Sequence, residues 1–490
     1  MSERPVVLAI GGTDPSGLAG LAVDVRTISA LGAHPAIVVS AITAQNNQRV
    51  SRVDAVPALQ LKAQLDALDT TSISVVKTGL LASAEQIDVV AAFLSQHKLP
   101  AVIDPVLGSS SGAAFLDDTG QAALKTRLFP LATVVTPNLP EAAQLSRADH
   151  TEPSRLANAL GAQVGHSIVI KGGHDDGRDA ADVYHGPDQR FRLTSQRQTT
   201  PYTRGTGCLF ASAIAAALAR GERVEDAVVI AKMAVNQALR EGYSPAGWTP
   251  GSPCLSHWPD NITDLPSLQN PDDPEPPKAA FADCDERPLG LYPIVDRAHW
   301  LTRLLPLGVT TIQLRIKDLQ GAALEAELAE GIALARQHNA RLFINDYWRE
   351  AIRLGAYGVH LGQEDLDTAR LDEIHRAGLR LGISTHCHAE VARAVTQKPS
   401  YIACGPVFPT TTKIMPWETL GLHGLRYWRS VLREYPLVAI AGIKTHNISE
   451  VAATGVSGVA MITAITEADD PETMTRTLMA GIASGRAQIA

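Results

Sequence analysis

Six polar side chains with complementary chemistry recur at short intervals in the second half of the chain: Gln313, Arg315, Lys317, Asn345, Asp346 and Asp365. Apolar and polar residues alternate over 311–317, which predicts a strand with Gln313, Arg315 and Lys317 on one face. Two cations and an amide that point into a fold are costly to bury unless they bind an anion. For this strand alone, a polar rim facing solvent is the alternative.

Carboxylates follow at the ends of the next two predicted strands. Asp346 comes directly after 343–345, and Asp365 comes shortly after 359–361. Magnesium prefers oxygen ligands and often takes only one or two protein carboxylates, with water and substrate phosphate completing its shell. Either aspartate taken singly could instead cap a helix. Together with the neighbouring cations, the pair predicts a site for magnesium and a phosphorylated ligand.

These side chains require a scaffold that brings successive strand ends to one rim. Eight short β-rich runs recur about every 24 residues, centred near positions 292, 312, 343, 359, 383, 402, 439 and 461. This spacing predicts eight strand–helix units closed into a parallel (βα)8 TIM barrel, with an open doubly wound sheet as the alternative. Later turns at 405–413, 441–442 and 462–463 fall where such barrels commonly bind phosphate.

The first half of the chain also alternates strands and helices. Strand-like runs lie at 6–10, 37–40, 75–77, 102–104, 134–136 and 167–171, and a hairpin is expected around 183 and 191. Alanine-rich stretches at 209–219 and 224–240 are predicted to be helices. The pattern indicates an α/β layered domain.

Two glycine-rich turns in this half could bind an anion. The segment 11–20 reads G-G-T-D-P-S-G-L-A-G, which alone is a weak signal because a tight structural turn explains it equally well. The segment 204–208 reads R-G-T-G-C and opens the predicted helix, so free backbone N–H groups would face a phosphate. Such an arrangement suits phosphoryl transfer.

The chain divides at a proline-rich stretch. Nine prolines lie between positions 250 and 288, next to an acidic patch at 272–275. This composition predicts a domain at 1–258, a linker at 259–287 and a second domain at 288–490. Each half is long enough to be an independent enzyme domain.

Bulk properties exclude several classes of protein. The chain has 490 residues, a net charge of −8 and no apolar run long enough to cross a membrane, and its N-terminus does not resemble a signal peptide. We therefore expect a cytoplasmic protein without a membrane or nucleic-acid partner. Five cysteines without CxxC spacing argue against a disulfide framework and a zinc site. A homo-oligomer is possible.

Residues 288–490 resemble the thiamine-phosphate synthases. The resemblance implies that the pyrimidine diphosphate is bound by Gln313, Arg315, Lys317, Asn345, Ser384 and Lys413, and that magnesium is held by Asp346 and Asp365. It further implies that the thiazole phosphate is bound by Thr410, Thr412, Gly442, Ile462 and Thr463.

In this family the diphosphate leaves from the pyrimidine methylene carbon, and the thiazole nitrogen attacks the resulting cation. Magnesium with Arg315, Lys317 and Lys413 would stabilise the departing charge, so these cations are the expected catalytic residues. No catalytic histidine is expected, and His360, His386 and His388 are predicted to be structural or rim residues. A thiazole tautomerase sharing the barrel is the alternative.

Residues 5–250 or so resemble the hydroxymethylpyrimidine and phosphomethylpyrimidine kinases of the ribokinase-like fold. The likeness lies in the first glycine loop and in A-Q-N (44–46), K-T-G (77–79), D-P-V (104–106), T-P-N-L-P-E (136–141), K-G-G-H (171–174) and G-T-G-C (205–208). It implies pyrimidine contacts from Asp24 and Gln45. Lys171 would bind the ATP phosphates, and Glu141 would contact Mg-ATP.

Further contacts to substrate or ATP are implied for Gly11, Gly205, Thr206 and Gly207. Cys208 stands where most ribokinase-like enzymes have an aspartate base, so it is the candidate base. A small buried residue that begins a helix is the simpler interpretation of this cysteine.

Three departures from the kinase pattern surround the substrate: Leu18 for a glycine, Arg204 for the histidine before G-T-G-C, and Ser109-Ser110 for Ala-Lys. They leave open how well each of two successive phosphorylations proceeds. A pyridoxal-type kinase and a non-catalytic pyrimidine-binding module are the alternatives. We expect the chain to use ATP and Mg²⁺, to phosphorylate the aminopyrimidine twice and to couple it with the thiazole phosphate.

Overall fold

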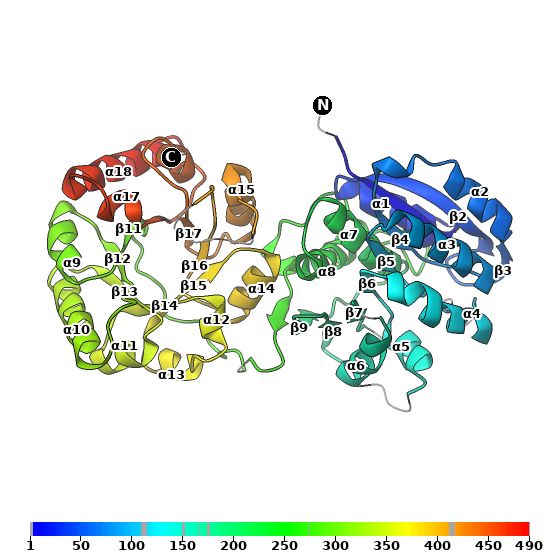
Figure 1. Cartoon of the computed structure of the whole chain (residues 1–490), viewed down its shortest axis with the longest axis horizontal. Coiled ribbons are helices and arrows are strands. Elements are labelled where there is room, and N and C mark those ends of the chain that lie inside the picture. Colours follow the sequence, from blue (N-terminus) through cyan, green and yellow to red (C-terminus); the bar gives the residue numbers. More distant parts are fainter. Residues whose placement is uncertain are drawn as a thin grey trace. The chain divides into compact units, whose positions relative to one another are not determined.

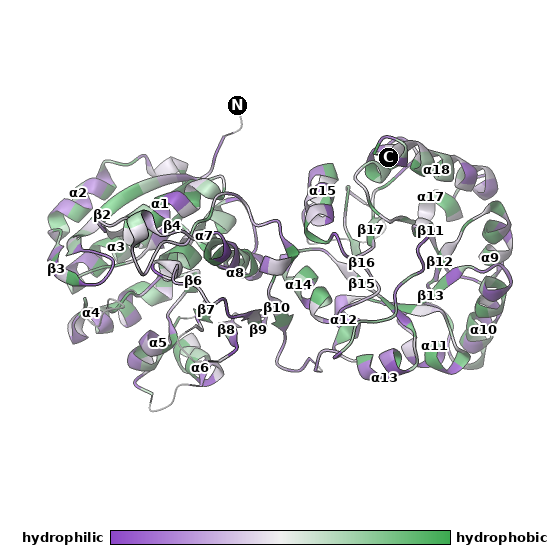
Figure 2. Ribbon diagram, turned by 180° about the vertical axis from the view of Figure 1, so that it is seen from behind, coloured by the Kyte–Doolittle hydropathy of each residue, from purple (hydrophilic) through white to green (hydrophobic). Residues whose placement is uncertain are grey.

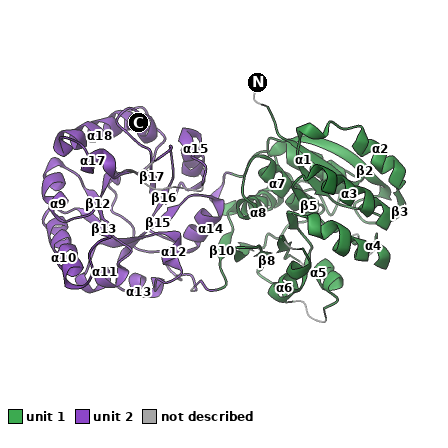
Figure 3. Cartoon of the chain, viewed as in Figure 1, with its two compact units in different colours: residues 1–259, 263–271 green, residues 260–262, 272–490 purple. Residues whose placement is uncertain are grey.

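The computed structural model describes residues 3–108, 115–148, 152–164, 166–173, 177–273, 275–410 and 417–489. The chain forms two compact units, Met1–Pro259 with Thr263–Pro271 and Asp260–Ile262 with Asp272–Ala490 (Figure 3). None of the described helices combines the length and apolarity needed to cross a bilayer.

Unit 1 is built on one mixed sheet (Figure 1). In the described part of the chain it has ten strands in the order β10-β9-β8-β7-β6-β5-β4-β1-β2-β3. Their bounds are Val6–Gly12 (β1), His34–Gln45 (β2), Val50–Ala55 (β3), Ile73–Thr78 (β4), Ala101–Ile103 (β5), Val134–Val135 (β6), Ser167–Ile170 (β7), Asp179–His185 (β8), Arg190–Gln196 (β9) and Ser267–Gln269 (β10). The central strands pair in parallel, and the expected hairpin is β8–β9.

Helices cover both faces of this sheet because successive strand residues point to opposite sides. Leu8 and Ile10 of β1 pack into a core that includes residues of α2, α3, α5 and α6, while α1 and α7 pack on the other face. The helices are Gly20–Ala30 (α1), Ala58–Asp66 (α2), Ala84–His97 (α3), Asp118–Ala123 (α4), Leu139–Ser146 (α5), Pro153–Val164 (α6), Thr206–Ala219 (α7) and Val224–Arg240 (α8). The buried sides of α7 are rich in alanine, which allows close approach to the sheet and to α8.

Unit 2 is a closed parallel barrel in the order β11 to β18. The strands are Gly290–Val295 (β11), Thr311–Leu314 (β12), Arg341–Asn345 (β13), Gly358–Leu361 (β14), Arg380–Thr385 (β15), Tyr401–Cys404 (β16), Leu437–Ile440 (β17) and Gly458–Met461 (β18). All eight predicted strand centres fall within them. The predicted α/β layered domain followed by a (βα)8 barrel is confirmed, and the open-sheet alternative is wrong.

Helices ring the barrel: His299–Leu304 (α9), Gly321–Gln337 (α10), Trp348–Leu354 (α11), Gln363–Leu366 (α12), Leu371–Arg376 (α13), His388–Thr396 (α14), Gly421–Val431 (α15), Ile448–Ala452 (α16), Thr463–Thr466 (α17) and Pro471–Arg486 (α18). In Figure 2, α10 carries both hydrophobic and hydrophilic colours, and its buried residues include Leu324, Leu328 and Ile332. This is the pattern of a helix with one face on a barrel.

The stretch predicted as a linker, 259–287, is ordered over much of its length. Its strand β10 pairs antiparallel with β9 in unit 1. Further on, Asp273 forms a buried ion pair with Arg393 in unit 2. This stretch therefore pairs first with a strand of unit 1 and then, further along the chain, with a side chain of unit 2.

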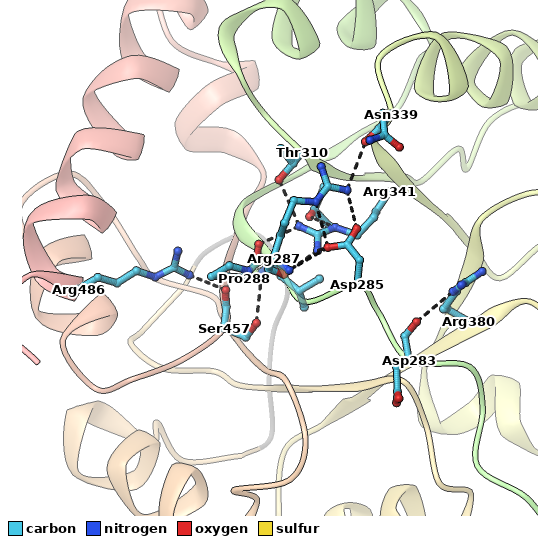
Figure 4. A network of polar contacts seen from close by, with 12 residues as sticks. Asp283, Asp285, Arg287, Pro288, Thr310, Asn339, Arg341, Arg380, Ser457 and Arg486 are labelled. Carbon is cyan, nitrogen blue, oxygen red and sulfur yellow. Dashed lines mark hydrogen bonds and ion pairs between the residues drawn. The ribbon is translucent and has the colours of Figure 1, made fainter. Parts of the chain in front are cut away.

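Arg341, the first residue of β13, fixes the chain where it enters the barrel (Figure 4). Its guanidinium is almost fully buried and donates to the Asp285 carboxylate at 2.9 Å and to the carbonyls of Arg287 and Pro288 at 2.8 Å. The hydroxyls of Thr310 and Thr311 accept two more hydrogen bonds. A buried guanidinium tolerates burial when its donors are satisfied in this way.

A cavity of about 440 Å³ lies at this same end of the barrel, away from the strand ends that carry the predicted site. Arg429 and Arg433 line it and donate to the carbonyls of Leu432 and Ser430 at the end of α15, so we regard them as helix caps. Arg486 also lines it and donates to the carbonyl of Ser457, directly before β18.

Two candidate active sites

The predicted cations of the barrel lie just beyond the end of their strand. β12 stops at Leu314, three residues before the predicted strand end, and the backbone N–H of Arg315 donates to the Val295 carbonyl at 2.7 Å. The alternation nonetheless continues, since Ile316 is buried while Arg315 and Lys317 are exposed. Gln313 is buried inside the barrel. The two cations therefore stand at the rim and the amide stands below them.

Lys317, Asp346 and Asp365 meet at this rim. Lys317 Nζ lies 2.5 Å from Asp346 Oδ2. Asp346 has a φ of 63°, a left-handed conformation that costs a residue with a side chain about 1–3 kcal/mol. Asp365 accepts the Gly362 N–H at 2.8 Å, so it also stabilises the start of α12. Asp365 is thus the third residue of α12 and not its N-cap, which is Gly362, although its carboxylate does accept the N-cap N–H.

The two aspartates are close enough to influence each other. Burial raises the pKa of Asp365, and the neighbouring Asp346 carboxylate raises it further. Among the described residues there is no cluster of three or more His, Cys, Asp or Glu side chains that could hold a metal. Two mutually repelling carboxylates at a rim nevertheless fit Mg²⁺, which needs only one or two protein carboxylates.

Below the rim runs a chain of buried hydrogen bonds that the sequence did not reveal. Tyr292 OH lies 2.8 Å from Tyr401 OH, which lies 2.6 Å from His360 Nδ1, and His360 Nε2 lies 2.8 Å from Ser384 Oγ. Burial lowers the pKa of His360 to about 4, so the ring is neutral near pH 7. His360 thus supports Ser384, the predicted diphosphate ligand.

Gln363 is a second side chain that sequence reasoning missed. Its amide donates to the Ser384 carbonyl at 2.7 Å, and its buried Oε1 has no hydrogen-bond partner within the described ranges. Asn345, the last residue of β13, is buried next to His360 in the strand register. The sequence feature that could have identified Gln363 as a site residue is its position directly after Gly362, the glycine that follows β14.

The structure describes some, but not all, of the residues predicted to bind the thiazole phosphate. Gly442 follows β17 with a φ of 69°, and a Cβ there would lie 2.5 Å from the Phe408 carbonyl oxygen. Ile462 follows β18, and Thr463 begins α17. Thr410 is described, whereas Thr412 and Lys413 lie outside the described residues.

In unit 1, a cleft of about 200 Å³ gathers almost all of the predicted kinase residues. It is lined, among others, by Gly11, Asp24, Gln45, Glu141, Lys171, Gly205, Gly207 and Cys208. Thr206 is the exception, because its hydroxyl donates to the Thr203 carbonyl at 3.0 Å and it does not line the cleft.

Asp24 offers one free acceptor to the cleft. Its Oδ1 accepts from Lys77 Nζ and from Ser212 Oγ, both at 2.8 Å, while its buried Oδ2 has no partner in the described part of the chain. Lys77 and Ser212 are further residues without a predicted role. Although burial acts against its charge, the anions around Lys77 raise its pKa overall.

Lys171 and Glu141 stand at another part of the cleft wall. Lys171 Nζ lies 2.8 Å from the Asp104 carboxylate. The Glu141 carboxylate accepts the backbone N–H groups of Leu107 and Asn138, and the Glu141 N–H donates to Asn138, so it also caps α5. Burial raises the pKa of Glu141, opposed by Lys171.

Cys208 lies between the charged groups of the cleft. Burial raises the pKa of its thiol to about 11, with Lys77 opposing the shift. A thiol in this environment is protonated near neutral pH. A base role would therefore require the substrate complex to favour the thiolate.

Comparison with known proteins gives a family match for each unit. Residues 14–250 match the family model of phosphomethylpyrimidine kinase, and residues 291–465 match that of thiamine monophosphate synthase. A thiamine-phosphate synthase of Photorhabdus laumondii is 56% identical over 194 residues, which are 40% of this chain and 89% of that protein.

The chain belongs to the thiamine-phosphate synthase family. Its first unit is a ribokinase-like domain of the phosphomethylpyrimidine kinase family, so the predicted bifunctional arrangement is confirmed. The chain is an enzyme of thiamine biosynthesis, and neither the tautomerase nor the binding-module alternative is favoured.

Two solved structures resemble the kinase domain. Phosphomethylpyrimidine kinase from Clostridium difficile is 30% identical, with a TM-score of 0.43, and the match covers 48% of this chain and 99% of that one. Pyridoxal kinase from Staphylococcus aureus, in complex with AMP-PCP and pyridoxal, is 27% identical, with a TM-score of 0.49, and covers 55% and 98%.

Proposed function

We propose that this thiamine-phosphate synthase family member phosphorylates 4-amino-5-hydroxymethyl-2-methylpyrimidine and its phosphate with ATP, and then couples the diphosphate with thiazole phosphate. The observation that carries the proposal is the meeting of cations, carboxylates and a supported hydroxyl at neighbouring strand ends of the barrel. The products would be thiamine phosphate and diphosphate.

In the barrel, the ligand's diphosphate would lie against Arg315 and Lys317, with Ser384 and Asn345 donating hydrogen bonds from deeper positions. Asp346 and Asp365 would hold Mg²⁺, which supplies positive charge to the diphosphate oxygens. As the bond to the methylene carbon breaks, negative charge grows on the leaving group, and these fixed cations stabilise that charge more than they stabilise the ground state.

Lys317 would change partners during this process. Its ammonium pairs with Asp346 in the structure. With Asp346 engaged as a magnesium ligand, Lys317 would turn toward the diphosphate. The neutral His360 supplies no proton, which fits a reaction that needs no general acid or base.

In the kinase cleft, the free Oδ2 of Asp24 would accept the exocyclic amine of the pyrimidine. Lys171 would bind ATP phosphates, Glu141 would approach Mg-ATP, and the backbone of the loop around Gly205 and Gly207 would face the transferred phosphoryl group. The same assignments distinguish an aminopyrimidine from pyridoxal, which has no ring amine for Asp24.

Two variants of the full chain test the proposal. Asp346→Ala should abolish coupling of supplied diphosphate and leave ADP release from ATP and the pyrimidine alcohol unchanged. Lys171→Ala should abolish ADP release and leave coupling of supplied diphosphate unchanged. If the wild-type chain releases no ADP with the pyrimidine, or if Asp346→Ala keeps full coupling activity in magnesium, the corresponding assignment is wrong.

A further inference from the structure

Arg204, directly before the glycine loop of the kinase, has no counter-ion among the residues that the structure describes. Its Nη2 donates to Gln45 Oε1 at 3.3 Å and its Nη1 donates to the Asn47 carbonyl at 3.4 Å. The Nε–H is buried and has no partner. Both contacts are to neutral oxygens, and no carboxylate among the described residues pairs with this guanidinium.

The other cations of the cleft are compensated. Lys77 pairs with Asp24 and Lys171 pairs with Asp104, each at 2.8 Å. Arg204 lines the same cleft. A half-buried guanidinium with an unused N–H and no carboxylate is costly unless a ligand supplies the anion. The third carboxylate of the cleft, Glu141, accepts backbone N–H groups and is not paired with Arg204, so within the described residues this guanidinium has no direct ion-pair partner.

Arg204 also fixes the orientation of Gln45. Arginine can only donate hydrogen bonds, so the Gln45 amide must turn its oxygen toward Arg204. The Gln45 amide nitrogen is then available to donate to a ligand. Together with the free acceptor of Asp24, this gives one donor and one acceptor, which suits a ring nitrogen next to an exocyclic amine.

Arg204 contacts Gln45, which would bind the ring, and it directly precedes the loop at 205–207, which would face the transferred phosphoryl group. The substituent that a bound pyrimidine extends toward this loop is its hydroxymethyl or phosphomethyl arm. An alcohol brings no charge to Arg204, whereas a phosphate brings close to two negative charges near pH 7.

We propose that Arg204 binds the phosphate of the monophosphorylated pyrimidine and makes the kinase domain selective for the second phosphorylation. This inference rests on the proposed kinase function and deepens it. In that step an oxygen of the dianionic acceptor phosphate attacks the γ-phosphorus of ATP, the bond to the β,γ-bridging oxygen breaks, and ADP leaves.

No proton has to be removed in this second step, because the acceptor oxygen is already ionised. The first step differs, because the alcohol must lose its proton as the new phosphorus–oxygen bond forms. Arg204 and Cys208 would therefore matter for different steps: the arginine for the charged acceptor, and the thiol for the neutral one.

The test uses Arg204→Gln and Arg204→Lys in the full chain, with kcat/KM measured separately for the alcohol and for the monophosphate. Arg204→Gln keeps an amide N–H that can donate to Gln45 Oε1 but removes the charge. Loss of the charge-assisted hydrogen bond should lower kcat/KM for the monophosphate about 10- to 100-fold, with less than about a threefold change for the alcohol. Arg204→Lys, which keeps the charge, should recover part of the loss. Titration calorimetry without ATP should show the same selective loss of monophosphate binding.

Arg52→Gln is the matched control, because Arg52 is an exposed arginine of β3 and pairs only with Asp54 in the described part of the chain. It should change neither substrate. Equal losses on both substrates would mean that Arg204 only orients Gln45 or binds ATP, and unchanged kinetics would mean that it binds nothing; either result overturns the inference. A wild-type chain that phosphorylates neither pyrimidine would instead overturn the proposed kinase function.

Discussion

At the rim of the barrel, the side chains that would bind a ligand are held by one another before it arrives. Lys317 is paired with Asp346, and Asp365 bonds to the backbone of Gly362. Such contacts order the two aspartates before a metal binds, which reduces the entropy that these side chains lose on binding. The closeness of the Asp346 and Asp365 carboxylates also lowers the stability of the fold, because the two negative charges repel each other.

This cost predicts a stabilising substitution that damages function. Because its pKa is raised, Asp365 destabilises the fold while it is ionised; the cost decreases as the pH falls through the raised pKa and is gone below the unfolded-state value of about 3.8. Asp365→Asn keeps an acceptor for Gly362 and should raise the Tm of the metal-free protein by about 2 °C at pH 7, with much less effect at pH 4.

Scanning calorimetry with and without magnesium would measure both effects. Asp365→Asn should also lose the magnesium-dependent rise in Tm that we expect of the wild type. A variant that is less stable than the wild type at pH 7 would contradict the repulsion between Asp346 and Asp365.

His360 is a positioning residue if it acts through Ser384. Single variants His360→Asn and Ser384→Ala and the double variant form a cycle in which kcat/KM for the pyrimidine diphosphate is measured. The effects should be non-additive by about 1 kcal/mol or more, because the two side chains share one hydrogen bond. Additive losses would show independent roles.

The same histidine predicts a pH profile. Because burial lowers its pKa to about 4, no ionisation near 6.5 should appear in the coupling rate between about pH 5 and 8. A step near 6.5 that disappears in His360→Asn would contradict the neutral ring.

Cys208 makes a separate prediction for the alcohol step of the kinase. With a thiol pKa raised to about 11, the thiolate fraction grows roughly tenfold for each pH unit between 7 and 9. If the thiolate is the base, kcat for the alcohol should rise accordingly and Cys208→Ala should remove the slope. A flat profile in the wild type would exclude this role.

Among the elements, those with an unambiguous apolar period could be predicted and the others could not. The eight barrel strands are short buried runs at regular spacing, and all eight were found. β3 was missed because its side chains are largely exposed, so no buried period marks it. β10 has only three residues and depends on pairing with β9, a contact distant in sequence.

The candidate sites divide in a similar way. Residues at strand ends, such as Asp346, were predictable because parallel strands bring their carboxyl ends together. The contacts of His360 with Tyr401 and Ser384 were not, since they depend on side chains that meet inside the barrel from three strands. The uncompensated charge of Arg204 likewise appears only when its neighbours are known.

The turn after β17 predicts a strained position. Gly442→Ala would place a Cβ 2.5 Å from the Phe408 carbonyl in a left-handed conformation. We expect a loss of about 2 kcal/mol in the free energy of unfolding, and a higher KM for the thiazole phosphate, because the turn must move.

Gly378→Ala is the control for that experiment. Gly378 has a φ of 73°, and a Cβ added there would meet nothing within 4 Å, so it tests the conformational strain without the collision. If both substitutions cost the same free energy, the close approach to Phe408 contributes nothing.

For the whole molecule, two units with separate cores predict separate unfolding. Arg341→Met removes the buried donor group that ties Asp285 and the following carbonyls to the barrel. It should destabilise unit 2 by about 3 kcal/mol, because buried acceptors lose their partner. Kinase activity should persist at temperatures where coupling is lost.

Arg353→Ala, which breaks an exposed pair with Glu325, is the control and should change little. Intrinsic fluorescence and the two activities, followed through a thermal ramp, would separate the transitions. A parallel loss of both activities in Arg341→Met would show that the units unfold together.

The ties of the connecting segment also have a mechanical consequence. A pull on the chain ahead of the barrel would load the Asp273–Arg393 pair first, then the hydrogen bonds that Lys398 and Ser400 donate to carbonyls of this segment. The hydrogen bonds of Arg341 would be loaded after these, before any force reached β11. Strand β11 pairs with β18 to close the barrel. Tension from the preceding part of the chain would therefore act on the contacts of the connecting segment before it acted on the β11–β18 pairing that closes the barrel.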